Sequence, residues 1–139
     1  MITNPQDTID KQFSASGQVR RILLIEGNDL NRQLLSEHLG YLGYEVVSLA
    51  SGTHCFESLN QFRPQLILLN VKLPETEGYA LLQEIQQRSD WQRVPIFVIS
   101  ALTSSADRQR ALALGASQYF VKPIHLKALS QAIRELDER

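Results

Sequence analysis

The chain has 139 residues, 43% of them hydrophobic and 21% charged, with a formal net charge of −1. This length predicts one domain with a core of ordinary size, and the nearly balanced charge gives no broad attraction to nucleic acid or to an anionic membrane. No apolar run reaches the roughly 18 residues of a membrane span, and the first residues lack a signal-peptide pattern. The lone cysteine excludes an internal disulfide and, with three scattered histidines, forms no metal-ligand spacing, so a reducing, cytoplasmic location is expected.

Residues 1–18 are predicted to form a flexible N-terminal arm, because they are polar, include Pro5 and show no sustained apolar period. Residues 19–139 are predicted to form the folded domain, in which apolar runs alternate with segments of helical period. The expected strands are Arg21–Glu26, Tyr44–Leu49, Gln65–Asn70, Val94–Ser100 and Gln118–Val121. The expected helices are Asp29–Leu42, Gly52–Phe62, Tyr79–Ser89, Ala106–Leu114 and Leu126–Glu138.

The alternation of strands and helices indicates the fold class. Five strands, each followed by a helix, predict right-handed crossovers and a parallel sheet covered on both faces. The apolar runs Ile22–Ile25 and Leu66–Leu69 are typical of strands buried on both faces. We therefore expect an α/β, doubly wound, flavodoxin-like sheet of order 2-1-3-4-5 flanked by five helices, with a ligand crevice at the carboxyl ends of strands one and three. Four leucines of the first helix fall at helical spacing: Leu34, Leu35, Leu39 and Leu42.

Four of the five expected strands end in, or just beyond, a polar side chain that could reach this crevice. These side chains are Glu26, Asn70, Ser100 and Lys122. The chain here resembles the receiver domain of two-component response regulators, over about Arg20 to Leu136. That family has an acidic pair after strand one, a phosphoryl-accepting aspartate after strand three, Ser or Thr then Ala after strand four, and Lys-Pro after strand five.

The resemblance assigns roles to the residues of this chain that match those motifs. The matching residues are Glu26 at the first acidic position, Leu73-Pro74 with Gly78 in the loop after strand three, Ser100-Ala101, Lys122-Pro123, and Tyr119 where the family places its switch aromatic. Ser100 and Lys122 are also interpretable as relics that satisfy each other's hydrogen bonds, and Tyr119 as an ordinary core aromatic.

Two departures from the family pattern bear on function. Asn70 stands at the position of the phosphoryl-accepting aspartate, and an amide cannot form an acyl phosphate. Gly27 stands at the second acidic position, so two of the family's three pocket carboxylates are missing and Glu26 against Lys122 leaves a net pocket charge of zero. Mg²⁺ is normally held by carboxylates, so its binding is expected to be lost or very weak, and no other cofactor, metal or catalytic residue is expected. Asp29 is better interpreted as an N-cap or first-turn residue than as a replacement carboxylate.

The leading hypothesis is a pseudo-receiver, a non-enzymatic module that keeps the receiver shape and signals by protein–protein contact. Its expected surface is the face of the fourth helix, fifth strand and fifth helix, and its expected partner is a histidine kinase, another response regulator or a separate output protein. The chain stops after the fifth helix, so we expect no output domain, no contact with nucleic acid and none with a membrane. Two alternatives stay open: an active phosphorelay protein that takes phosphate on another carboxylate, for which Glu26 is the candidate, and a small-ligand-binding flavodoxin-like domain.

Overall fold

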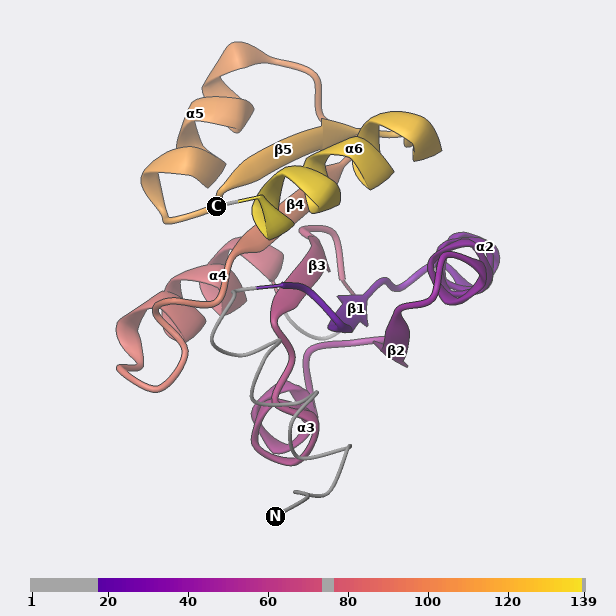
Figure 1. The fold of residues 1–139 in the computed structure, drawn as a ribbon. Coiled ribbons are helices and arrows are strands. Elements are labelled where there is room, and N and C mark those ends of the chain that lie inside the picture. Colours follow the sequence, from indigo (N-terminus) through magenta and orange to yellow (C-terminus); the bar gives the residue numbers. More distant parts are fainter. Residues whose placement is uncertain (1–17, 74–76, 139) are drawn as a thin grey trace.

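Short apolar strands pair in parallel to form the sheet of this protein (Figure 1), whose computed structural model describes residues 18–73 and 77–138. Within these residues the strands are β1 (Arg21–Ile25), β2 (Glu45–Leu49), β3 (Leu66–Asn70), β4 (Ile96–Ser100) and β5 (Gln118–Val121). Their order is β2-β1-β3-β4-β5, which confirms the predicted fold class. The strands pair with their ends aligned, so Ile25 lies opposite both Leu49 and Leu69, and Asn70 lies opposite Ile99.

Helices cover both faces of the sheet, because successive side chains of a strand point to opposite faces and those of the central strands β3 and β4 are apolar up to their polar last residues. The helices are α2 (Asp29–Tyr41), α3 (Cys55–Phe62), α4 (Gly78–Gln87), α5 (Ser105–Ala113) and α6 (Leu126–Asp137). Ile22 and Leu24 of β1 face the core shared with α2 and α6, whereas Leu23 and Ile25 face the core shared with α3, α4 and α5. The doubly wound arrangement is visible in Figure 1.

Local sequence signals place the helix ends, with some differences from the expected bounds. Gly43 and Gly115 follow α2 and α5 with φ of 100° and 113°, the left-handed conformation that glycine favours. The second expected helix, α3, begins at Cys55 rather than Gly52, because Gly52 lies in a turn in which its carbonyl accepts a hydrogen bond from the Cys55 amide. Burial raises the pKa of the Cys55 thiol to about 12, as befits a small apolar core residue.

The four leucines at helical spacing, three in α2 and Leu42 directly after it, do not form one buried stripe. Leu35 and Leu39 are buried in the core, but Leu34 is 52% exposed and Leu42 is 42% exposed. The helix contacts the sheet along a narrow side, so the flanking leucines remain in contact with solvent.

A close backbone approach fixes the chain after β3. The Gly78 amide donates to the carbonyl of Val71 at 2.9 Å, and a Cβ added at Gly78 would lie 2.2 Å from Cα of Val71. Only glycine fits this contact, which directs the chain from the carboxyl end of β3 into α4.

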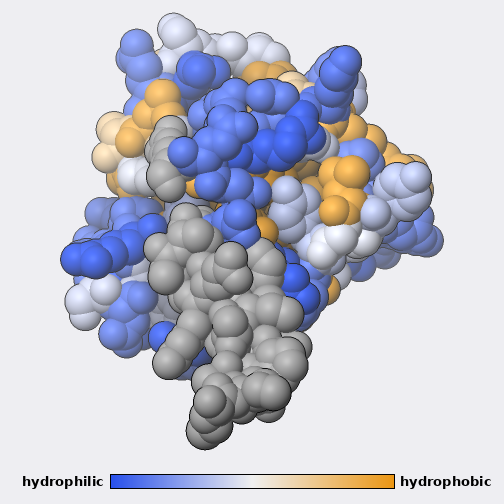
Figure 2. Space-filling view, in the orientation of Figure 1, coloured by the Kyte–Doolittle hydropathy of each residue, from blue (hydrophilic) through white to orange (hydrophobic). Residues whose placement is uncertain are grey.

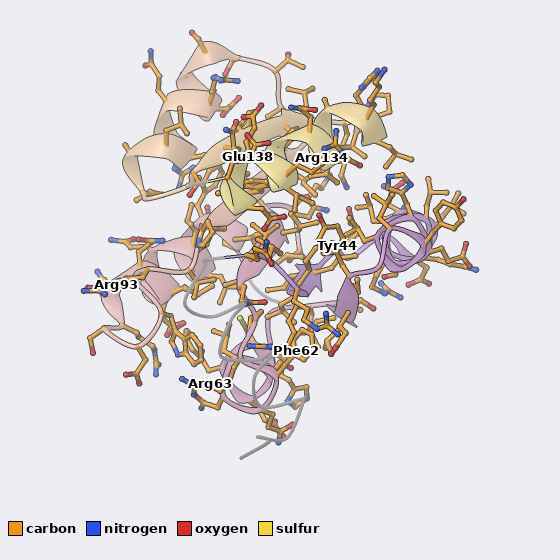
Figure 3. The ribbon with its side chains drawn as sticks, viewed as in Figure 1. Tyr44, Phe62, Arg63, Arg93, Arg134 and Glu138 are labelled. Carbon is orange, nitrogen blue, oxygen red and sulfur yellow. The ribbon has the colours of Figure 1, made fainter. Side chains whose placement is uncertain are left out.

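Different residues lie at the two edges of the sheet where its strands begin and where they end. Tyr44 and Arg93, labelled in Figure 3, lie shortly before β2 and β4 and so mark the amino-terminal edge. The polar residues predicted to form a site lie at the opposite, carboxyl edge. The side of the surface seen in Figure 2 carries apolar residues in small separate groups among hydrophilic ones. No helix within the described residues is long and apolar enough to span a membrane, and the predicted arm lies outside the described residues except for Gln18.

Candidate functional site

Glu26 and Asn70 meet at the carboxyl edge of the sheet. Glu26 directly follows β1 and Asn70 ends the neighbouring strand β3, and the pairing of Ile25 with Leu69 sets the two polar residues side by side. Glu26 is 0% exposed and Asn70 is 5% exposed. A buried carboxylate is costly unless charge and hydrogen bonds compensate for lost water, so the surroundings of Glu26 define the site.

Three donors compensate the Glu26 carboxylate. The Lys122 ammonium lies 2.7 Å from Oε1. Nδ2 of Asn70 donates to Oε2 at 2.7 Å, and the backbone amide of Asn28 donates to the same oxygen at 2.9 Å. Lys122 thus balances the charge at Oε1, while the other two donors bind Oε2. The structure brings together Glu26, Asn70 and Lys122, as the sequence predicted.

The Asn70 amide is engaged at both ends. Its nitrogen donates to Glu26, and its oxygen accepts a hydrogen bond from the backbone amide of Lys72 at 3.2 Å. The side chain is therefore held in one orientation, with the oxygen directed toward the loop after β3. Gly27, which follows Glu26, contributes no side chain to this edge.

Ser100 and Tyr119 lie on the other side of the crevice and organise the loop after β4. The Ser100 hydroxyl oxygen accepts from the Leu102 amide at 3.0 Å, and the buried Tyr119 hydroxyl donates to the carbonyl of Leu102 at 2.7 Å. Ser100 contacts Lys122 through its backbone, since its carbonyl accepts from the Lys122 amide at 2.8 Å. The interpretation in which Ser100 and Lys122 satisfy each other's side chains is therefore wrong, because the ammonium is directed to Glu26 instead.

Sequence reasoning missed the contribution of the loop between β1 and α2. Asn28 caps α2 by accepting from the Asn31 amide at 2.9 Å, which turns its own amide toward Glu26. Arg32 donates to the carbonyl of Glu26 at 2.9 Å and pairs with Asp29 at 2.6 Å. Asp29 is thus a first-turn residue of α2, as expected. The signal available in the sequence was the spacing of Asp29 and Arg32 along one helix face.

The donor set at this edge does not fit Mg²⁺. That cation prefers carboxylate oxygens in octahedral geometry, together with water and phosphate oxygens. The crevice offers one carboxylate, whose two oxygens already receive Lys122, Asn70 and Asn28. Across residues 18–73 and 77–138 there is no group of three or more His, Cys, Asp or Glu side chains placed to hold a metal ion.

Fold and site together define the chain as a doubly wound parallel α/β domain with a polar crevice where strands one and three end. The family model of the response regulator receiver domain matches residues 22–134. The chain therefore belongs to the receiver domain family of two-component systems.

Relatives of known sequence or structure agree with this assignment. The chain is 37% identical over 120 residues to the probable transcriptional regulator ycf27 of Cyanophora paradoxa and 35% identical over 122 residues to that of Porphyridium aerugineum. These matches cover 86% and 88% of the chain but 49% and 50% of the relatives, so the chain spans about half their length. The receiver domain of the sensor histidine kinase PA1611 from Pseudomonas aeruginosa, which holds a magnesium ion in its active site cleft, is 30% identical, with a TM-score of 0.78 and coverage of 87% of this chain and 99% of that one.

Proposed function

We propose that this receiver domain accepts no phosphoryl group and signals through contact with another protein. The observation that carries the proposal is the amide of Asn70, which occupies the acceptor position and is locked to Glu26 and to the Lys72 backbone. An acyl phosphate requires a carboxylate oxygen as the nucleophile, and the amide nitrogen has its lone pair delocalised.

The electrostatics of the crevice support the same proposal. The P. aeruginosa receiver domain holds a magnesium ion in its active site cleft. In this chain Gly27 and Asn70 supply no carboxylate, and Lys122 neutralises the remaining one. A divalent cation would have to displace the ammonium from a buried partner, so we propose that the domain rests in a charge-balanced state without metal.

Phosphorylation of Glu26 is the alternative that the sequence left open. Glu26 is fully buried, and all the donors described above converge on its carboxylate oxygens. A phosphoryl donor would need to reach a side chain that no solvent reaches. This observation favours the pseudo-receiver function over the alternative.

The proposed contact surface is the α5–β5–α6 face, which the sequence analysis named as the fourth helix, fifth strand and fifth helix. β5 is the edge strand of the sheet, paired only with β4 among the described strands. Three large apolar residues on or beside α5 and β5 are exposed: Leu102 at 47%, Leu112 at 39% and Val121 at 40%. Exposed apolar side chains next to a sheet edge are suited to protein contact. A histidine kinase, a response regulator or a separate output protein is the proposed partner, rather than nucleic acid or a membrane, given the net charge of −1.

Intact-mass measurement after incubation with acetyl phosphate and Mg²⁺ tests the proposal. We expect the mass of the wild-type protein to stay unchanged, while a receiver domain that has the aspartate gains one phosphoryl group under the same conditions. A stoichiometric phosphoryl adduct on the wild-type chain would overturn the proposal.

A further inference from the structure

The first turn of α6 is capped by a side chain that can gain a proton. His125 is the N-cap residue of α6, and its Nδ1 accepts a hydrogen bond from the backbone amide of Ala128 at 3.2 Å. Asn28 of α2 and Ser104 of α5 make side-chain caps of the same kind. Neither an amide nor a hydroxyl changes its charge between about pH 5 and 8, whereas a histidine does.

The cap hydrogen bond determines where a proton is added to the His125 ring. A neutral imidazole has one N–H group and one acceptor nitrogen, so an Nδ1 that accepts from Ala128 requires the hydrogen to be on Nε2. The next proton is added to Nδ1, the same nitrogen that receives the Ala128 amide. Protonation therefore converts the acceptor into a donor and removes the cap.

The charges on α6 oppose the protonated form of His125. The amino end of a helix carries a partial positive charge, and the first turn of α6 contains no acidic residue that would offset an imidazolium. The first turns of α2 and α5, by contrast, contain Asp29 and Asp107. Lys127 adds a further positive charge to the first turn of α6.

The elements packed against α6 are α2 and the sheet. Their charged or titratable groups beside the start of α6 are Glu26 and Lys122, which line the cleft between α2 and the chain leading into α6, and His38 about one turn further along. Glu26 and Lys122 form an ion pair with each other, and His38 contacts Ser130. Within residues 18–73 and 77–138 none of these groups forms an ion pair or a hydrogen bond with His125.

The other two histidines of the chain keep their contacts when they are protonated. The Ser130 hydroxyl donates to a backbone carbonyl, so its oxygen accepts from Nε2 of His38 at 3.3 Å, and that nitrogen carries a hydrogen in the protonated ring as well. Nδ1 of His54 lies 3.4 Å from the Glu57 carboxylate, a contact that protonation strengthens. His125 is therefore the histidine whose contact is lost when the pH falls.

The first turn of α6 is connected to the core, because Ile124 and Leu126, on either side of His125, are partly buried and pack against it. We propose that His125 is a pH-sensitive cap: the neutral imidazole holds the first turn of α6, and protonation releases this turn and loosens the packing of Ile124 and Leu126. The cap itself does not depend on whether the domain accepts a phosphoryl group. Its effect on signalling rests on the proposed function, since α6 is part of the α5–β5–α6 face and acidification would loosen the surface offered to a partner.

Chemical denaturation at about pH 7.5 and about pH 5.5 tests the proposal on the wild type and on His125→Asn. Asparagine is a good N-cap residue that does not titrate, so this variant keeps the cap at both values. Stability that depends on the neutral imidazole is present at the higher pH and is lost as the pH falls. We expect acidification to raise the unfolding equilibrium constant of the wild type about three- to fivefold more than that of His125→Asn.

NMR spectra of the ¹⁵N-labelled protein give a local measurement of the same cap. The ring nitrogens of His125 should show the hydrogen on Nε2 at about pH 7.5, and the Ala128 amide proton should shift as His125 titrates. His38→Gln is the matched control, because it removes the histidine at the contact between α2 and α6 and should keep the extra pH dependence of the wild type.

Equal pH dependence of the wild type and His125→Asn would overturn the proposal, as would a hydrogen on Nδ1 of His125 at about pH 7.5. Loss of the extra pH dependence in His38→Gln would assign the effect to His38 and would also overturn it. These outcomes are separable from that of the proposed function, because a phosphoryl adduct on the wild type would overturn the pseudo-receiver proposal and leave the pH dependence of the cap unchanged.

Discussion

The two halves of the crevice have departed from the receiver pattern to different degrees. The half at β4 and β5 retains Ser100 and Lys122, and Tyr119 still anchors the following loop through Leu102. In the half at β1 and β3, glycine and asparagine stand at two of the three acidic positions. Lys122, directly after β5, links the halves by charge, because its ammonium lies 2.7 Å from Oε1 of Glu26.

We propose that the difference reflects a site that has lost its phosphoryl chemistry while keeping the receiver fold. With glycine and asparagine at two of the three acidic positions, one carboxylate and one ammonium remain, and the pairing of Lys122 with the buried Glu26 balances their charges. Asn70 then replaces an acceptor of phosphate with a donor to Glu26. The half at β1 and β3 is thus stabilised by direct contacts between side chains, and we propose that it needs no metal ion to balance its charge.

The largest expected effect comes from breaking the ion pair that joins the two halves. Lys122→Met leaves the buried Glu26 carboxylate without its counter-charge, and we expect it to lower the free energy of unfolding by about 3–5 kcal/mol at neutral pH. Glu26→Gln leaves an ammonium whose side chain is 20% exposed, so its cost should be smaller, about 2–3 kcal/mol. Chemical denaturation of both single variants and the double variant measures these changes.

The double variant should lose less stability than the sum of the single variants, because it has no unpaired buried charge. The Glu77–Arg110 pair, with side chains 59% and 55% exposed, is the matched control, and its removal should cost about 0–1 kcal/mol. Strictly additive effects of Glu26→Gln and Lys122→Met would show that the two halves are not coupled through this pair.

A substitution at Gly78, where the chain passes from β3 into α4, should have the next largest effect on stability. Gly78→Ala places a Cβ against the Val71 backbone, so the loop after β3 must shift, and we expect a loss of about 1–3 kcal/mol of unfolding free energy. Gly40→Ala is the control, because its added Cβ has no atom within 4 Å apart from its chain neighbours and the helix's own backbone, and alanine favours a helix. Equal thermal denaturation midpoints for the two variants would contradict the close approach.

A substitution in the half at β4 and β5, which retains the receiver pattern, should lower stability least. Tyr119→Phe removes the hydrogen bond to the Leu102 carbonyl and should cost about 0.5–1.5 kcal/mol in thermal or chemical denaturation. Tyr41→Phe, at a tyrosine that is 89% exposed, should change stability by less than about 0.5 kcal/mol. A loss for Tyr119→Phe as large as that for Lys122→Met would mean that the retained half carries the stability of the crevice.

Hydrophobic periodicity predicted the fold, since continuous apolar strands and amphipathic helices admit few other arrangements. The proximity of Glu26, Asn70 and Lys122 followed from the strand ends of a parallel sheet. Periodicity does not report how tightly a helix lies on the sheet, so the exposure of Leu34 and Leu42 could not be predicted. The contacts of Asn28, Arg32 and Lys72 depend on loop geometry and backbone amides, which side-chain identity alone does not specify.

The most direct test of the central claim compares phosphorylation of the wild type, Asn70→Asp, and the double variant Gly27→Asp with Asn70→Asp. Each is incubated with acetyl phosphate and Mg²⁺ and analysed by intact mass. We expect no adduct on the wild type, little or none on the single variant because Gly27 still denies the metal a ligand, and a clear phosphoryl adduct on the double variant. A single variant that reacts as well as the double, or a wild type that reacts at all, would contradict the account.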